Sequence, residues 1–145
     1  MKMLRISYIF ILALGIYPLL GLSYVNAQEL LITHPNNSKS SISQQDIKNI
    51  FLGKKTHWPN GNRIKIVVQK RGSAHDSLLK NVIGMTSVSF RNYWRKRVFT
   101  GSSRPPKTFK SDSDVVAFVA SKPGSVGYIN INSDLKGVKK LQISQ

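Results

Sequence analysis

The segment Lys70-Arg71-Gly72-Ser73 is the strongest candidate for chemistry, because it combines two cations, a glycine and a hydroxyl. A run of Ile and Val that predicts a buried strand precedes it, and a predicted helix starts at Ser73. Unpartnered backbone amides at the helix start, the Ser73 hydroxyl and the Arg71 guanidinium could together bind one small oxyanion. The same residues also fit an ordinary helix start, with Ser73 as the N-cap and Asp76 at the positive helix end. The local sequence leaves both interpretations open.

Other residue types that catalyse reactions or bind metals are scarce or scattered. The chain has 145 residues with no Cys, three His and six Asp or Glu, so disulfides, thiolate metal sites and thiol nucleophiles are excluded. His34, His57 and His75 lack the spacing of metal ligands. Ser73, His75 and Asp76 lie on one helical turn and do not form the relay of a serine hydrolase. We therefore expect no enzyme activity, no metal and no cofactor.

The N-terminus has the order of a secretory signal. Lys2 and Arg5 precede an uncharged, mostly apolar stretch over 6–25, and Val25-Asn26-Ala27 provides the residues that a signal peptidase reads. The alternative is a retained membrane anchor, because about twenty uncharged residues are long enough to span a bilayer.

Cleavage is favoured because Pro18 and Gly21 interrupt a helix shortly before the cleavage site. We predict a signal peptide over 1–27, cleavage after Ala27, and one folded domain over 28–145. The protein is then expected in the periplasm.

The rest of the chain predicts short strands alternating with short helices. Strands are expected over 29–33, 63–69, 126–131 and 138–143, and helices are expected to be capped by Ser43, Ser73, Thr86 and Ser111. Alternation of this kind favours an α/β fold with some parallel strand pairing.

The formal charge of +16 arises from 22 Lys and Arg against 6 Asp and Glu. One predicted helix carries Arg91, Arg95, Lys96 and Arg97, which form a basic surface suited to a polyanion, an anionic lipid or an envelope partner. The alternative is a solvated cationic face with Trp94 in the core. We expect no intracellular nucleic acid as a partner, because the protein is exported.

Several segments carry a resemblance to a known family. Ile47 to Trp58 contains I-F-L-G-K-K-T-H-W, which resembles the I-F-L-G-K-x-T-x-W segment of the phosphate-binding proteins of high-affinity ABC transporters. The resemblance continues through Gly72-Ser73 and Phe99-Thr100-Gly101, and it ends at Pro123 to Ile129, which is similar to P-G-A-I-G-Y-V. The best match is to the short PstS-like members. It implies an α/β, reduced type II periplasmic-binding-protein-like fold, with a small mixed sheet flanked by about four helices.

This resemblance implies phosphate or a similar oxyanion as the ligand, and ABC-type phosphate uptake or sensing as the role. Gly72 and Ser73 match the family's phosphate loop, roughly R-S-D-G-S-G-T, whereas its Arg falls on Gln69 and Arg71 is the candidate substitute. Two further contact loops are expected over 33–41 and 100–104. The candidate ligand residues are Arg71, Gly72, Ser73, Thr33, Ser40, Ser41, Thr100 and Gly101.

Two classes of function therefore remain for the folded domain. The first is an exported solute-binding-like protein that holds an oxyanion and works with a membrane permease or a sensor protein. The second is a non-transport periplasmic adaptor or sensor module that contacts an envelope partner or polyanion through its basic helix. We expect a monomer in both cases.

Overall fold

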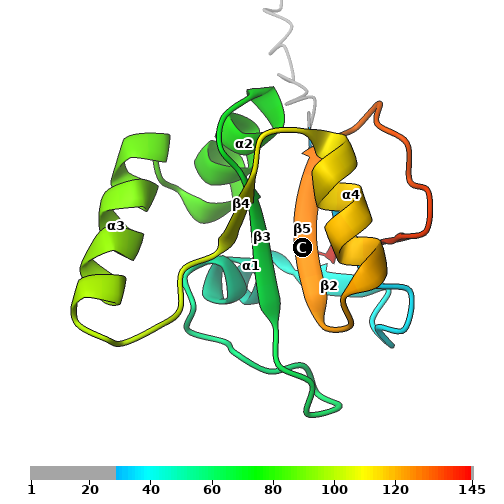
Figure 1. The fold of residues 1–145 in the computed structure, drawn as a ribbon, viewed down its shortest axis with the longest axis horizontal. Helices are drawn as coiled ribbons and strands as arrows, with labels where there is room; N and C mark the ends of the chain where they lie inside the picture. The colour runs from blue at the N-terminus through cyan, green and yellow to red at the C-terminus, as the bar shows by residue number, and fades with distance from the viewer. Residues whose placement is uncertain (1–28, 145) are drawn as a thin grey trace, which may run out of the picture.

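A mixed sheet of five strands forms the centre of the fold in the computed structural model, which describes residues 29–144 (Figure 1). The strands of the protein are β1 Glu29–Thr33, β2 Ser41–Ser43, β3 Lys65–Gln69, β4 Lys107–Phe109, β5 Ser125–Asn130, β6 Lys139–Lys140 and β7 Gln142–Ser144. The order in the sheet is β4-β3-β5-β1-β6, and β2 pairs with β7 separately. β3 runs parallel to β4 and β5, whereas β1 runs antiparallel to β5. The small mixed sheet is thus confirmed, and the signal peptide predicted over 1–27 lies outside the described residues.

Side chains of the central strands alternate between two apolar clusters. Val67 and Ile129 belong to the cluster on one face of the sheet, and Val68 and Tyr128 belong to the cluster on the other. All four are buried. The prediction of a strand buried on both faces is therefore confirmed for the end of β3.

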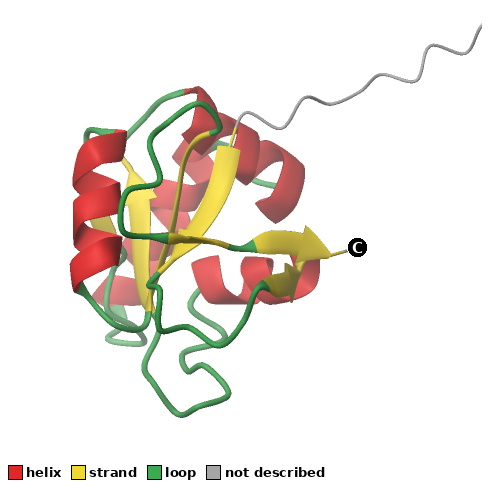
Figure 2. Cartoon of the chain, turned by 90° about the vertical axis from the view of Figure 1, so that its right-hand side faces the viewer, coloured by secondary structure: helices red, strands yellow, loops and turns green. Residues whose placement is uncertain are grey.

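Helices cover both faces of the sheet, as the turned view shows (Figure 2). α4 (Asp112–Ser121) packs on the Val67 side, while α1 (Gln44–Phe51), α2 (Ser73–Leu78), the π-helical η1 (Leu79–Ile83) and α3 (Ser87–Phe99) contribute to the Val68 side. The four α-helices within residues 29–144 agree with the prediction of about four. None of the helices in the described part is long and apolar enough to cross a membrane.

Three of the four predicted N-caps are confirmed and one is wrong. Ser43, Thr86 and Ser111 each accept a hydrogen bond from the backbone N–H three residues later. α2, however, begins at Ser73 itself and its N-cap is Gly72, which has no side chain to cap the helix. Gly72 has φ +127°, so the chain enters the helix one residue earlier than the Ser73 interpretation requires.

The predicted C-terminal strand is divided in two. Leu141 separates β6 from β7, because its side chain turns into the core and its N–H donates to the carbonyl oxygen of Leu31 at 2.9 Å. The short strands β2 and β4 were not predicted, since three residues are too few for a periodic pattern.

The C-terminal end of α1 holds α3 in place. The indole N–H of Trp94 donates to the carbonyl oxygen of Phe51 at 3.1 Å, and the Tyr93 hydroxyl donates to that of Leu52 at 2.7 Å. The next residue is Gly53, whose φ of +67° suits a glycine after a helix end. A Cβ atom there would lie 2.7 Å from Cη2 of Trp94, so α3 packs directly on this glycine.

We predict that Gly53→Ala lowers the free energy of unfolding by about 2–4 kcal/mol, because it adds backbone strain and a clash with Trp94. Gly61→Ala is the matched control, since Gly61 has φ +84° but an added Cβ would meet nothing within 4 Å. The control should lose only about 1–2 kcal/mol. Denaturant unfolding measures both, and equal losses would contradict the packing of α3 on Gly53.

Candidate oxyanion site and adjoining groove

The turn between β3 and α2 is open to solvent. Lys70, Arg71, Gly72 and Ser73 are all exposed. The N–H of Lys70 donates to the carbonyl oxygen of Phe109 at 2.8 Å, which ties the end of β3 to β4. An added Cβ at Gly72 would make only an ordinary contact, so its positive φ and not a lack of space requires glycine.

The backbone amides of this turn are not capped by a side chain. Within the described part of the chain, the N–H groups of Ser73 and Ala74 have no hydrogen-bond acceptor. The first backbone N–H of the helix that forms a hydrogen bond is that of Asp76, which donates to the carbonyl oxygen of Gly72 at 3.0 Å. The Asp76 carboxylate instead accepts a hydrogen bond from the Ser87 hydroxyl at 2.6 Å. Neither the Ser73 side chain nor the Asp76 carboxylate, the two groups of the plain-cap interpretation, therefore caps these amides.

Buried polar groups fix the turn from below. The Tyr128 hydroxyl accepts a hydrogen bond from the Gln69 N–H at 3.0 Å and lies 2.5 Å from Nδ1 of His75. Burial lowers the pKa of His75, Asp76 opposes this shift, and Arg91 adds to it. Burial also raises the pKa of Tyr128. The His75 ring and the Tyr128 hydroxyl form one buried hydrogen bond, and this pair joins β5, the end of β3 and the first turn of α2.

The resemblance places the family's loop arginine on Gln69, whose side chain forms hydrogen bonds inside the protein. Its amide donates to the carboxylate of Asp112, which also accepts from the Asn130 N–H at 2.9 Å and from the Ser133 hydroxyl. Gln69 is buried and does not contribute to the turn. The exposed Arg71 is therefore the guanidinium closest in sequence to Gly72 and Ser73.

The structure does not bring Thr33 to this turn. Its side chain is fully buried, with the hydroxyl donating to the Ser125 carbonyl at 2.8 Å and accepting from Asn37 at 2.9 Å. Thr33 pairs with Val126 near the start of β5. β3 runs parallel to β5, and its register places Gln69 beside the other end of β5. About three residues of strand, roughly 10 Å, separate the two levels. One small ion cannot contact both.

The other two predicted contact loops also lie elsewhere. Ser40 and Ser41 join the pairing with β7, where the Ser40 carbonyl accepts from the Gln142 N–H at 2.9 Å. α3 begins at Ser87, which contacts Asp76 in α2. Its 13 residues span about 20 Å, so Thr100 and Gly101, which follow its other end, lie far from the turn. Only Arg71, Gly72 and Ser73 of the predicted ligand residues therefore share one place.

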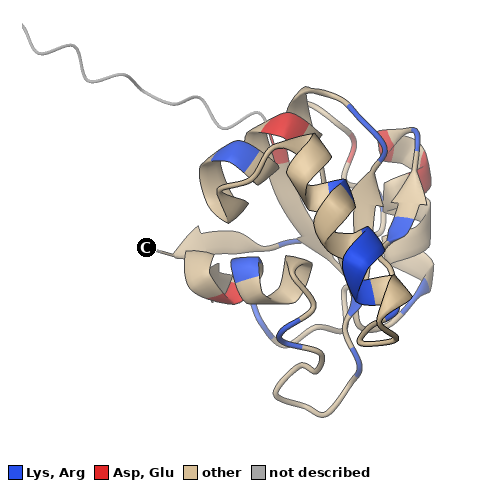
Figure 3. Ribbon diagram, turned by 90° about the vertical axis from the view of Figure 1, so that its left-hand side faces the viewer, with Lys and Arg blue, Asp and Glu red and all other residues tan. Residues whose placement is uncertain are grey.

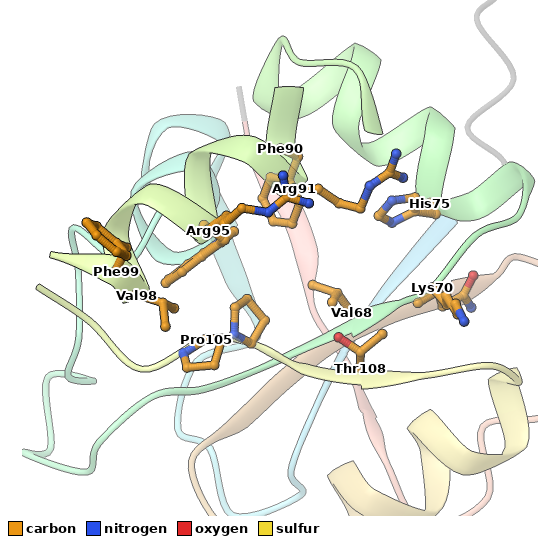
Figure 4. Close-up of a pocket in the computed structure, with 13 residues that line it drawn as sticks. Val68, Lys70, His75, Phe90, Arg91, Arg95, Val98, Phe99, Pro105 and Thr108 are labelled. Atoms are coloured by element: carbon orange, nitrogen blue, oxygen red, sulfur yellow. The ribbon is translucent and has the colours of Figure 1, made fainter. Parts of the chain in front are cut away.

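A groove of about 760 Å³ adjoins the turn (Figure 4). It lies between α3 and the strands β3 and β4, and its lining includes Val68, Lys70, His75, Arg91, Arg95 and Phe99. Arg91 and Arg95 were predicted to lie on a basic surface, but the groove itself was not predicted. The sequence did contain a signal for this wall of the groove. Arg91 and Arg95 are four residues apart, and Val98 and Phe99 continue this spacing, so all four share one helix face.

Arg97 differs from the rest of the predicted basic surface. Its guanidinium donates to the Ser103 hydroxyl at 2.6 Å and to the Gly53 carbonyl at 3.4 Å, and it lies 5.7 Å from the centre of the Tyr93 ring. Arg97 is half-buried, so it fastens the loop after α3 and is not a free surface cation. Arg91, Arg95 and Lys96 are exposed.

The surface of the described part is strongly basic. Lys and Arg are distributed over α3 and its surroundings, with few Asp or Glu among them (Figure 3). In residues 29–144 the one ion pair is that of Lys55 with Asp46 at 3.0 Å. The same residues contain no group of three or more His, Asp or Glu that could hold a metal ion.

Comparisons with known proteins identify the fold. A family model described as PBP superfamily domain matches residues 24–143. The fold is similar to PstS from Borrelia burgdorferi, with a TM-score of 0.62, 20% identity and coverage of 81% of this chain and 47% of that one. It is also similar to an ABC-type phosphate transport receptor from Vibrio cholerae, with a TM-score of 0.55, 17% identity and coverage of 80% and 46%. A search of curated proteins finds no match.

These similarities confirm the type II periplasmic-binding-protein fold and the PstS-like resemblance. The chain spans less than half the length of the two structures.

We predict that His75 makes stability fall on mild acidification. The folded state holds its pKa below the ordinary value of 6.5, so the stability present above that pH is lost as the pH falls from about 6.5 toward the folded pKa. His75→Gln should therefore show a flatter unfolding free energy between about pH 7.5 and pH 5.5 than the wild type. Denaturant unfolding at several pH values measures the slope.

His57→Gln is the control, because His57 is exposed. It should keep the wild-type slope, and an unchanged slope in His75→Gln would contradict the buried neutral histidine.

Proposed function

Since the chain belongs to the PBP superfamily domain family, we propose that it is an exported solute-binding-like protein that holds phosphate or a similar oxyanion. It performs no chemistry on the ligand. The proposal includes a signal peptide over 1–27, a binding domain over 28–145, a periplasmic location, and a monomer that works with a membrane permease or a sensor protein.

The observation that carries this proposal is the uncapped turn at Gly72 and Ser73. Its free amides and the Ser73 hydroxyl supply neutral donors, while Arg71 and Lys70 supply positive charge. Bonds from such groups to an anion are stronger than bonds between neutral groups. The hydrogen bond from Ser87 to Asp76 supports the proposal further, because it keeps the nearest carboxylate away from the amides.

A second candidate is the periplasmic adaptor or sensor module without a transport role. It is favoured by Arg91, Arg95 and Lys96, which are exposed on α3 and have no ion-pair partner among the described acids. In this case the partner is an envelope protein or polyanion, and phosphate itself is not bound.

We predict that calorimetric titration of the purified protein with phosphate gives saturable heat. Arg71→Ala should weaken the affinity by about tenfold or more, and Ser73→Ala by about fivefold, because each removes a donor to the anion. Lys122→Ala is the charge-matched control, since Lys122 is exposed at the end of α4, and it should bind as the wild type does.

Two results would contradict an oxyanion site at this turn. The absence of heat at millimolar phosphate and sulfate would favour the adaptor. Phosphate binding that is unchanged in Ser73→Ala and is lost at about 0.5 M salt would be due to the general positive charge of the protein and not to a site at this turn.

A further inference from the structure

The groove beside α3 has two chemically different ends. Lys70, His75 and Arg91 gather at the end next to the turn, whereas Val98, Phe99 and Pro105 lie at the other end (Figure 4). Arg95 lies between them along α3. The wall formed by α3 from Arg91 to Phe99 is roughly 12 Å long. A ligand that uses the whole groove is therefore elongated, with one charged end.

The charged end requires a negative partner. Lys70 and Arg91 both line the groove, and neither has an ion-pair partner within residues 29–144. Two neighbouring cations repel each other, and an anionic group between them removes this cost.

The apolar end requires a partner of its own. Phe99 is 91% exposed and Val98 is 43% exposed, although both lie on the helix face that borders the groove. Pro105 and Pro106 line the opposite wall without a polar side chain. A free phosphate ion has no apolar surface and cannot cover these residues, so the oxyanion site alone leaves this part of the groove unexplained.

We propose that the groove binds a single-chain amphiphile, a molecule with one anionic head group and one alkyl chain. The head lies between Lys70 and Arg91, and the chain extends along α3 past Arg95 to Phe99. Burial of each methylene group contributes about 0.8 kcal/mol in transfer from water, which is roughly a three- to fourfold gain in affinity. This inference goes beyond the proposed function, because it requires neither Arg71 nor Ser73.

Other occupants fit the groove less well. A second copy of this chain would bring another highly basic surface against it, and like charges repel. The apolar segment over 6–25 carries no acidic residue for the charged end. A membrane surface suits a protruding face better than a groove bordered by walls on two sides.

The test is a calorimetric titration with a series of alkyl phosphates below their micelle concentrations. The affinity should rise by at least about tenfold from octyl to dodecyl phosphate. Dodecyltrimethylammonium, which has the same chain and a positive head, should not bind. An affinity that is independent of chain length, or equal binding of the two heads, would overturn the proposal.

Substitutions on α3 locate the binding. Phe99→Ser should lower the affinity for dodecyl phosphate by about tenfold, because the contact with the alkyl chain is lost. Arg91→Gln should lower it by a similar factor, because the contact with the head group is lost. Val88→Ser and Lys96→Gln are matched controls on the same helix, because both residues are exposed and neither lines the groove. Equal losses in variants and controls would overturn the assignment to the groove.

Two further measurements separate this inference from its alternatives. Phe99→Ser should leave the binding of inorganic phosphate unchanged, because Phe99 lines the groove and is not part of the oxyanion site, so the two sites can fail independently. Binding to vesicles of anionic phospholipid without binding to dissolved dodecyl phosphate would assign α3 to a membrane surface and overturn the proposal.

Discussion

The buried hydroxyl of Tyr128 is the contact on which the functional end of this molecule depends. It accepts the Gln69 N–H and lies within hydrogen-bond distance of His75, so one atom joins the last residue of β3, the first turn of α2 and the centre of β5. Because the hydroxyl is shielded from water, loss of either partner would leave a buried polar group unsatisfied. The open turn can thus be exposed to solvent and still have a fixed shape.

Features that are decided within a few residues could be predicted from the sequence. The caps at Ser43 and Ser111 are examples, because each bonds to an amide three residues away and needs nothing from the rest of the fold. The start of α2 was misassigned by one residue, since Gly72 and Ser73 are both acceptable N-caps and the φ of +127° at Gly72 is set by the route from β3 into α2. Local chemistry alone does not decide between them.

Features that depend on strand direction could not be predicted. The loop after Thr33 was expected at the oxyanion site, but β1 runs antiparallel to β5 and carries that loop to the opposite end of the sheet. Nothing in the five residues of β1 encodes this direction. The role of Gln69 was equally hidden, because its partner Asp112 lies 43 positions later in the chain.

The attachment of α3 also determines the width of the groove. One wall belongs to the sheet and the other to a helix fastened through Trp94 and Tyr93 to the carbonyls that end α1. Arg97 adds a third fastening through Ser103. A bulky guest that forced the walls apart would have to break these bonds, so the proposed ligand must be slender enough to fit between the walls as they stand.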